Sequence, residues 1–227
     1  MAARAIFELK RVPFAKVFPA PGDPPGALLA WTGQESYPAA MYEDERPRTG
    51  WAAILLLAER LSPEPRPVPR DSRDRALVFG LAHEICGELG LGWCRRLLGM
   101  QPRLERAPDD PDVRHCAREY GSSPGEAGTA RARVVEVLRL LADQLRRQRA
   151  AGSAYLVGSA LSAADVYWAT FSNMVALLPP ERLPLSEPVR TSFATTDAEI
   201  VAALDPGLLA HRDEIYRRHL ELPVAVS

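Results

Sequence analysis

Apolar residues recur at helical spacing in several long segments of the chain. Between Trp51 and Leu61, the positions Ile54, Leu57, Ala58 and Leu61 follow the i, i+3, i+4, i+7 pattern of one helix face. A second such face lies within Arg131–Arg149 and consists of Val134, Val137, Leu138, Leu141 and Leu145. Each pattern predicts an amphipathic helix that buries one side.

The first part of the chain predicts short elements of both kinds. Met1–Lys10 has the pattern of a helix, and Val12–Phe18 predicts a short strand with its proline at the start or at a sheet edge. Gly26–Trp31 predicts one short helical stretch. Ala39–Glu43 predicts a second strand, and Glu45–Thr49 predicts a polar turn or a short edge strand. These elements together indicate a small mixed α/β domain.

The rest of the chain predicts helices throughout. Ser72–Met100 is expected to be one helix, with Leu77, Leu81, Ile85 and Leu89 at i+4 steps, loosened by Gly90 and Gly92. Further helices are expected at Pro111–Tyr120, Ser162–Leu178, Asp197–Leu204 and Pro206–Leu220, the first of these with one or two turns.

A proline-rich segment separates the two parts. Four prolines fall between Ser62 and Pro69, a density that neither a helix interior nor a central strand tolerates. We therefore expect an N-terminal domain over residues 1–62, a linker over 63–71 and an all-helical domain over 72–227.

The stretch Ala154–Ala169 contains the strongest local folding signal. Ser162 is suited to be an N-cap, and Asp165 follows at the third helical position, where its carboxylate can accept from the Ser162 N–H. Gly158 permits a tight turn before this box. The pattern predicts a capping box at the start of an apolar helix, with a structural rather than catalytic role for Asp165.

Composition and charge narrow the class of protein. The chain has 227 residues and a formal net charge of −1, which argues against nucleic-acid or anionic-membrane partners. Its longest apolar run, Trp51–Ala58, is far shorter than the roughly 20 residues of a membrane span. Cys86, Cys94 and Cys116 have neither CxxC nor zinc-ligand spacing, so we expect reduced thiols in a cytoplasmic protein and no metal.

The segment YLVGSALSAAD, placed after a mixed α/β part, a proline-rich linker and two long helical stretches, resembles the glutathione S-transferase superfamily. Leu156, Gly158, Ser162, Ala164 and Asp165 match the family pattern LxGxxxSxAD, which opens the sixth helix of that fold. The resemblance covers nearly the whole chain. It implies a thioredoxin-like N-terminal domain, an all-helical C-terminal domain and a homodimer.

The resemblance also implies a glutathione site in the N-terminal part. Tyr37-Pro38 resembles the loop whose cis-proline presents the preceding backbone to the cysteinyl part of glutathione. Ala53-Ile54 resembles the start of the third helix, which places Gly50 and Trp51 where the family has an acidic or amide residue followed by serine. Arg48 or Thr49 is then the candidate to supply the missing charge or hydroxyl near the helix N-terminus.

The sequence departs from the family at the catalytic loop. The first strand, with the loop that carries a catalytic Tyr, Ser or Cys, has no counterpart in these residues. We therefore expect Met1 to be an internal methionine of a longer natural protein, and we assign no catalytic residue. The departure also leaves open a non-catalytic binding or dimerisation module, or a glutathione-dependent lyase, isomerase or dehalogenase, besides a transferase that joins glutathione to a small apolar electrophile.

Other polar residues give weaker predictions. His83 and Cys86 share a helix face but are an incomplete metal pair, and Glu84 with Glu88 predicts a solvent-facing i, i+4 pair. Trp93, Arg95 and Arg96 are candidates to border a pocket. His211 and Asp213 lie near the end of the chain and match no catalytic triad.

Overall fold

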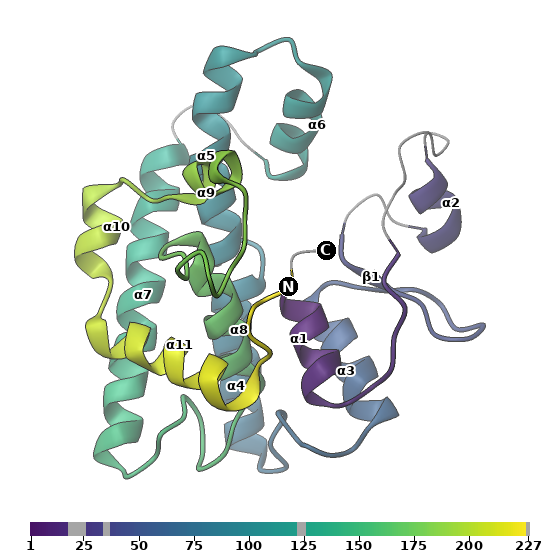
Figure 1. The fold of residues 1–227 in the computed structure, drawn as a ribbon, viewed down its shortest axis with the longest axis vertical. Helices are drawn as coiled ribbons and strands as arrows, with labels where there is room; N and C mark the ends of the chain where they lie inside the picture. Colours follow the sequence, from purple (N-terminus) through teal and green to yellow (C-terminus); the bar gives the residue numbers. More distant parts are fainter. Residues whose placement is uncertain (18–25, 34–36, 122–125, 226–227) are drawn as a thin grey trace. The chain divides into compact units, whose positions relative to one another are not determined.

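The structure is a computed structural model that describes residues 1–17, 26–33, 37–121 and 126–225. The chain forms two compact units, Met1–Arg66 and Pro67–Ser227, and the division falls inside the proline-rich segment. Their elements are drawn in Figure 1. Among the described residues, no helix combines the length and the apolar character that crossing a bilayer requires.

In its described residues, the first unit has three helices and one short antiparallel strand pair. Its elements are α1 (Ala2–Leu9), α2 (Ala27–Thr32), β1 (Ala39–Ala40), β2 (Arg48–Thr49) and α3 (Trp51–Leu61). Ala39 pairs with Thr49 and Ala40 with Arg48. The helix α3 has the predicted bounds, and β2 takes the form of the predicted edge strand.

The core of this unit lies between α1 and α3. Ile6, Ile54, Leu55 and Ala58 are almost completely buried. Beside them lies the buried ammonium of Lys10, which donates to Glu59 Oε1 at 2.6 Å and to the Pro65 carbonyl at 2.7 Å. The buried charge is thus paired and hydrogen-bonded, which is the condition under which burying a lysine is tolerated.

Two predictions for this unit need correction. Residues 12–17 form no strand, because the sheet in the described part of the chain contains only β1 and β2, and Phe18 lies outside the described residues. The strand predicted over Ala39–Glu43 spans only Ala39–Ala40, because the pairing with β2 ends there. A sequence pattern can suggest an extended segment, but only a partner strand makes it part of a sheet.

The second unit is helical. Its elements are α4 (Ser72–Cys86), α5 (Leu91–Arg106), α6 (Pro111–Glu119), α7 (Glu126–Ala150), α8 (Ala163–Phe171), the 3₁₀ turn η1 (Ser172–Met174), α9 (Glu187–Phe193), α10 (Ala198–Ala203) and α11 (Pro206–His219). In Figure 1, α4 and α7 run along the bundle and α11 crosses it.

The core of the second unit forms around α7 and α8. The five apolar residues predicted on the α7 stripe are all buried, and Ala163–Thr170 of α8 are buried on every side. The Trp168 indole N–H donates to the Leu208 carbonyl at 3.1 Å, so α11 is joined to α8 through a buried hydrogen bond. The helix α8 is therefore the centre of this unit.

The predicted helix Ser72–Met100 is two helices. The chain leaves α4 at Gly87 and starts α5 after Gly90, and the intervening Leu89 has a left-handed backbone with φ of 58°. A side chain at Gly90 would place its Cβ 2.7 Å from the Glu84 and His83 carbonyl oxygens, so only glycine permits this close turn. The buried stripe of α4 is Val78, Leu81, Ala82 and Ile85, whereas the predicted members Leu77 and Leu89 are exposed.

Candidate functional site

Five of the six residues predicted to bind glutathione lie at one end of the β1–β2 pair. Because Ala39 pairs with Thr49, the preceding Pro38 and the following Gly50 are the next neighbours along the two strands. The Tyr37–Pro38 peptide bond is cis, as the resemblance implied. Tyr37 precedes this end and is 61% exposed, and Trp51 begins α3.

The α3 N-terminus at this place has no side-chain cap. Gly50 is the N-cap and has φ of 74°, and the first backbone bond of the helix runs from the Ile54 N–H to the Gly50 carbonyl at 3.2 Å. The residues of the first turn include no carboxylate. The first-turn N–H groups of an α-helix make no backbone bond within the helix, and the positive end of the helix dipole lies at the same place.

The two candidates for the missing hydroxyl or charge differ in their surroundings. The Arg48 guanidinium donates to the Arg46 carbonyl and, at 2.5 Å, to Glu45 Oε2, so its charge is held by the turn between the strands. Arg60 joins the same carboxylate at 2.7 Å. The two guanidinium groups, Arg60 foremost, lower the pKa of Glu45 below its usual value. Thr49 is half-buried beside Gly50 and carries no charge.

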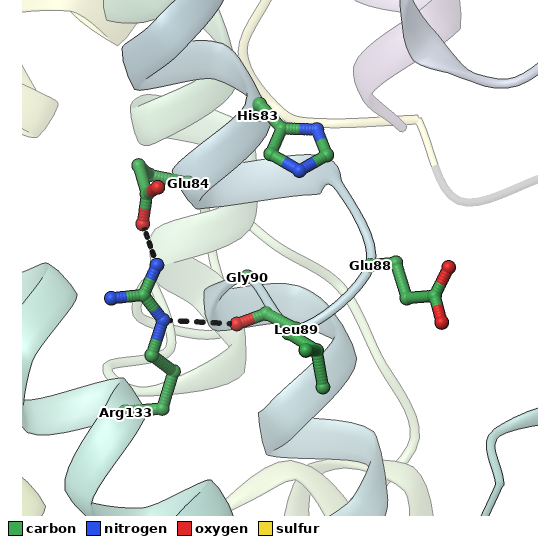
Figure 2. A pocket seen from close by; sticks show the side chains of 6 residues that line it. All are labelled: His83, Glu84, Glu88, Leu89, Gly90 and Arg133. Atoms are coloured by element: carbon green, nitrogen blue, oxygen red, sulfur yellow. Dashed lines mark hydrogen bonds and ion pairs between the residues drawn. The ribbon is translucent and has the colours of Figure 1, made fainter.

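The second unit contains a cavity of about 370 Å³ at the turn between α4 and α5. It is lined by His83, Glu84, Glu88, Leu89, Gly90 and Arg133. Figure 2 shows Arg133 reaching from α7 to the Glu84 carboxylate and to the Leu89 carbonyl, while the Glu88 side chain points away from both. Glu84 and Glu88 therefore do not converge on a common position, as an acid–base pair would have to do.

The Arg133 guanidinium donates hydrogen bonds to three partners at this cavity. It donates to Glu84, to Glu136 Oε2 at 2.7 Å and to the Leu89 carbonyl at 3.3 Å. The hydrogen bond to Glu136 is the largest cause that raises the pKa of the guanidinium, and the charges of Glu84 and Glu136 add to it against the opposing effect of burial. The network fastens the α4–α5 turn to α7, which indicates a structural role for the arginine.

His83 and Cys86 lie in different environments. His83 is exposed, and its ring packs so closely on Gly87 that a Cβ there would lie 2.3 Å from Nδ1. Cys86 is turned inward, and burial raises the pKa of its thiol well above the usual value against the opposing effect of Arg96. Among the described side chains, no three His, Cys, Asp or Glu residues are arranged to hold a metal ion.

Arg95 and Arg96, neighbours in α5, make different contacts. Arg95 donates to the carbonyl oxygens of Met174, at 2.8 Å, and of Ala194, at 3.3 Å. Arg96 instead lies near two aromatic rings, those of Tyr120 and Phe171. From the sequence, both arginines are candidates to border a pocket. The spacing of the residues gives no sign that Arg95 binds backbone carbonyls and that Arg96 lies beside aromatic rings.

The sequence predicts the capping box of Ser162 and Asp165 but not the deeply buried polar cluster to which it belongs. Ser162 and Asp165 form the predicted capping box, and both are essentially inaccessible to solvent. Asp165 Oδ2 accepts from the Ser162 N–H at 2.9 Å and from its hydroxyl at 2.7 Å. Asp165 Oδ1 accepts from the Leu156 N–H at 2.8 Å and lies 2.8 Å from His211 Nε2.

This cluster explains the role of His211. His211 and Asp213 are close in sequence, but they do not pair. Asp213 accepts from Arg212 Nε at 2.8 Å, whereas His211 faces Asp165. The two residues lie on α11 and α8, so no local spacing could have revealed the contact. Because the carboxylate has a protein donor on each oxygen and is closed to solvent, the cluster supports the fold and does not meet a substrate.

Comparison with known proteins adds no assignment. The chain matches no model of a known protein family, and no curated protein gives a match to it.

Proposed function

We propose that the chain is a glutathione S-transferase-like protein whose first unit binds glutathione at the β1–β2 end. The observation that carries this proposal is the register in which Ala39 pairs with Thr49. It groups the backbone around Tyr37-Pro38 with the start of α3, where the N-cap is a glycine. A peptide ligand with a carboxylate would meet backbone hydrogen-bonding groups from β1 and the N–H groups of the first turn of α3.

The proposal further includes a thioredoxin-like first domain, a cytoplasmic location and a homodimer, all from the resemblance in sequence. Support for the family also comes from the second unit, because the LxGxxxSxAD residues surround the start of its most buried helix. In the proposed reaction, the glutathione thiolate attacks the electrophilic carbon of a small apolar substrate. The new carbon–sulfur bond forms, the leaving group departs with the electron pair, and the thiol proton passes to solvent.

The alternative is a non-catalytic module that binds glutathione or a second copy of the chain. The observation that favours it is that Gly50 and Trp51 occupy the position of the family's polar pair. A glutathione-dependent lyase, isomerase or dehalogenase would use the same binding end.

The test is retention of the full chain on immobilised glutathione, followed by a turnover assay with a chloronitroaromatic. Retention with turnover supports the transferase, and retention without turnover supports the binding module. Absence of retention, together with no binding heat in calorimetry, would overturn the proposal.

A pair of variants at Ala52 tests the binding site itself. Proline is tolerated in the first turn of a helix but removes one N–H donor, so Ala52→Pro should weaken glutathione binding about tenfold, as expected for losing a hydrogen bond to a charged group. Ala52→Ser keeps the N–H and should bind as the natural chain does. Equal affinity in both variants would place the ligand elsewhere.

A further inference from the structure

Arg96 of α5 lies between aromatic rings from two other elements of the second unit. Its guanidinium carbon is 5.9 Å from the ring centre of Tyr120, which follows α6, and 6.0 Å from that of Phe171, the last residue of α8. Both distances are within the range of cation–π attraction. Three segments distant in sequence therefore meet at one charged group.

Most N–H donors of the Arg96 guanidinium make no hydrogen bond to a described residue. Among the described residues, the guanidinium donates one hydrogen bond, from a terminal nitrogen to the Gly92 carbonyl at 3.1 Å in its own helix. None of the ion pairs found among the described side chains involves Arg96, in contrast to Arg133. A guanidinium carries five N–H donors, so an edge of the group is open to a ligand.

The packing around Arg96 holds the guanidinium in place. A Cβ at Gly92 would lie 2.3 Å from Phe171 Cε1 and 3.3 Å from an Arg96 terminal nitrogen. The missing side chain thus allows the Phe171 ring and the arginine to approach the same turn of α5. Trp93 packs edge-on against Tyr120, with ring centres 5.0 Å apart, and extends the aromatic surface.

Among the described side chains, no carboxylate forms an ion pair with Arg96. Its charge acts on the Cys86 thiol, but burial is the larger effect there and raises the pKa of that thiol. The side chain of Arg96 itself is exposed. An exposed, restrained and uncompensated guanidinium beside aromatic rings is suited to a ligand that has both a negative charge and a planar apolar part.

We propose that Arg96, Tyr120, Phe171 and Trp93 form a binding site for a small aromatic carboxylate. The open edge of Arg96 donates two parallel N–H bonds to the carboxylate, the geometry that arginine favours. The aromatic part of the ligand rests against Tyr120 and Trp93. This inference does not depend on the proposed function, because the site lies within the second unit and its ligand is not glutathione.

Calorimetric titration of the full chain with 1-naphthoate tests the site in the absence of glutathione. We expect 1-naphthoate to bind and its uncharged analogue, 1-naphthamide, to bind at least about tenfold more weakly, because a charge-assisted bidentate pair is lost. Arg96→Gln should reduce the affinity for 1-naphthoate by a similar factor. The matched control is Arg139→Gln, an exposed arginine of α7, which should leave the affinity unchanged.

Two further variants separate binding from folding. Arg96→Lys keeps the charge but not the planar fork, so it should bind with intermediate affinity. Tyr120→Leu should weaken binding while leaving the charge in place. The proposal is overturned if the natural chain gives no binding, if the acid and the amide bind equally, or if folded Arg96→Gln, checked by its melting curve, keeps the natural affinity.

Discussion

His211 Nε2 lies 2.8 Å from Asp165 Oδ1, although the two residues are 46 positions apart. The contact joins α11 to the first turn of α8 inside the core. Asp165 also accepts from the Leu156 N–H and from Ser162, so one carboxylate organises the preceding loop, the helix start and the C-terminal helix. The capping box that the sequence predicts is one part of a larger buried hydrogen-bond network.

The first prediction concerns Asp165. An ordinary cap contributes about 1 kcal/mol, but removing Asp165 would leave several buried donors without an acceptor, each at a cost of about 1–3 kcal/mol. We expect Asp165→Ala to lower the free energy of unfolding by about 3 kcal/mol or more, measured by urea denaturation. The matched control is Asp71→Ala, because Asp71 caps α4 at the surface through the N–H groups of Arg73 and Asp74. Equal losses in the two variants would contradict a network role for Asp165.

The second prediction concerns pH. His219 lies 3.2 Å from the Tyr155 hydroxyl, and burial, with a smaller contribution from Arg218, lowers the pKa of its ring below 6.5. The unfolded chain then binds the proton more readily than the folded chain, so protonation favours unfolding. The stability contribution is complete above pH 6.5 and is lost as the pH falls toward the folded-state pKa.

The measurement compares the natural chain with His219→Gln over this range. The difference in unfolding free energy, natural chain minus variant, should decrease as the pH falls from about 7.5 to about 5. Asp197 does not disturb the comparison, because Arg131 lowers the pKa of its carboxyl below 3.8. Parallel stability curves for the two proteins would refute the assignment.

The third prediction compares two glycines. Neither Gly50 nor Gly80 has another group near the position of an added Cβ, but Gly50 has φ of 74° and Gly80 lies within α4. Gly50→Ala should therefore destabilise the first unit by about 1–3 kcal/mol through backbone strain alone. Gly80→Ala should stabilise α4 by about 0.5–1 kcal/mol. Thermal melting of both variants tests this, and a stabilising Gly50→Ala would show that the turn adopts another conformation.

The fourth prediction concerns Leu89, which is 60% exposed and has a left-handed backbone with φ of 58°. Asparagine tolerates this conformation better than leucine does, so Leu89→Asn should raise the unfolding free energy by about 0.5 kcal/mol. Leu77→Asn is the matched control. Leu77 is also exposed, at 39%, but lies within α4, and the same substitution should cost a few tenths of a kcal/mol, about the propensity difference. A loss at both positions would indicate that Leu89 makes contacts that outweigh its strain.

The predictions that succeeded rest on signals that lie within one element. The apolar spacing and the prolines after Leu61 determine α3, and the stripe from Val134 to Leu145 determines the buried face of α7. The Ser162–Asp165 box is likewise encoded by residues three positions apart. Such patterns express the geometry of a single helix, so the sequence alone suffices to predict them.

The features that the sequence did not predict depend on contacts between elements. The break at Gly87–Gly90 depends on how closely the turn approaches the last carbonyl groups of α4. Residues 12–17 form no strand, and the described sheet consists of β1 and β2 alone. For the candidate site, the sequence identified the residues at the β1–β2 end, but their grouping follows from the register of the pair and the engagement of Arg48 from the turn.

The helix α9, which the sequence analysis did not predict, is attached in an unusual way. None of its seven residues, all within the described part, is buried. It is held by Arg190, which donates to the Leu183 and Leu178 carbonyls, and by Arg95, which reaches the carbonyls of Phe193 and Ala194. Little apolar surface is thus lost when α9 detaches, and only a few hydrogen bonds must break. The amide protons of α9 should accordingly exchange with deuterium long before those of α8, and the second unit should open first at this helix.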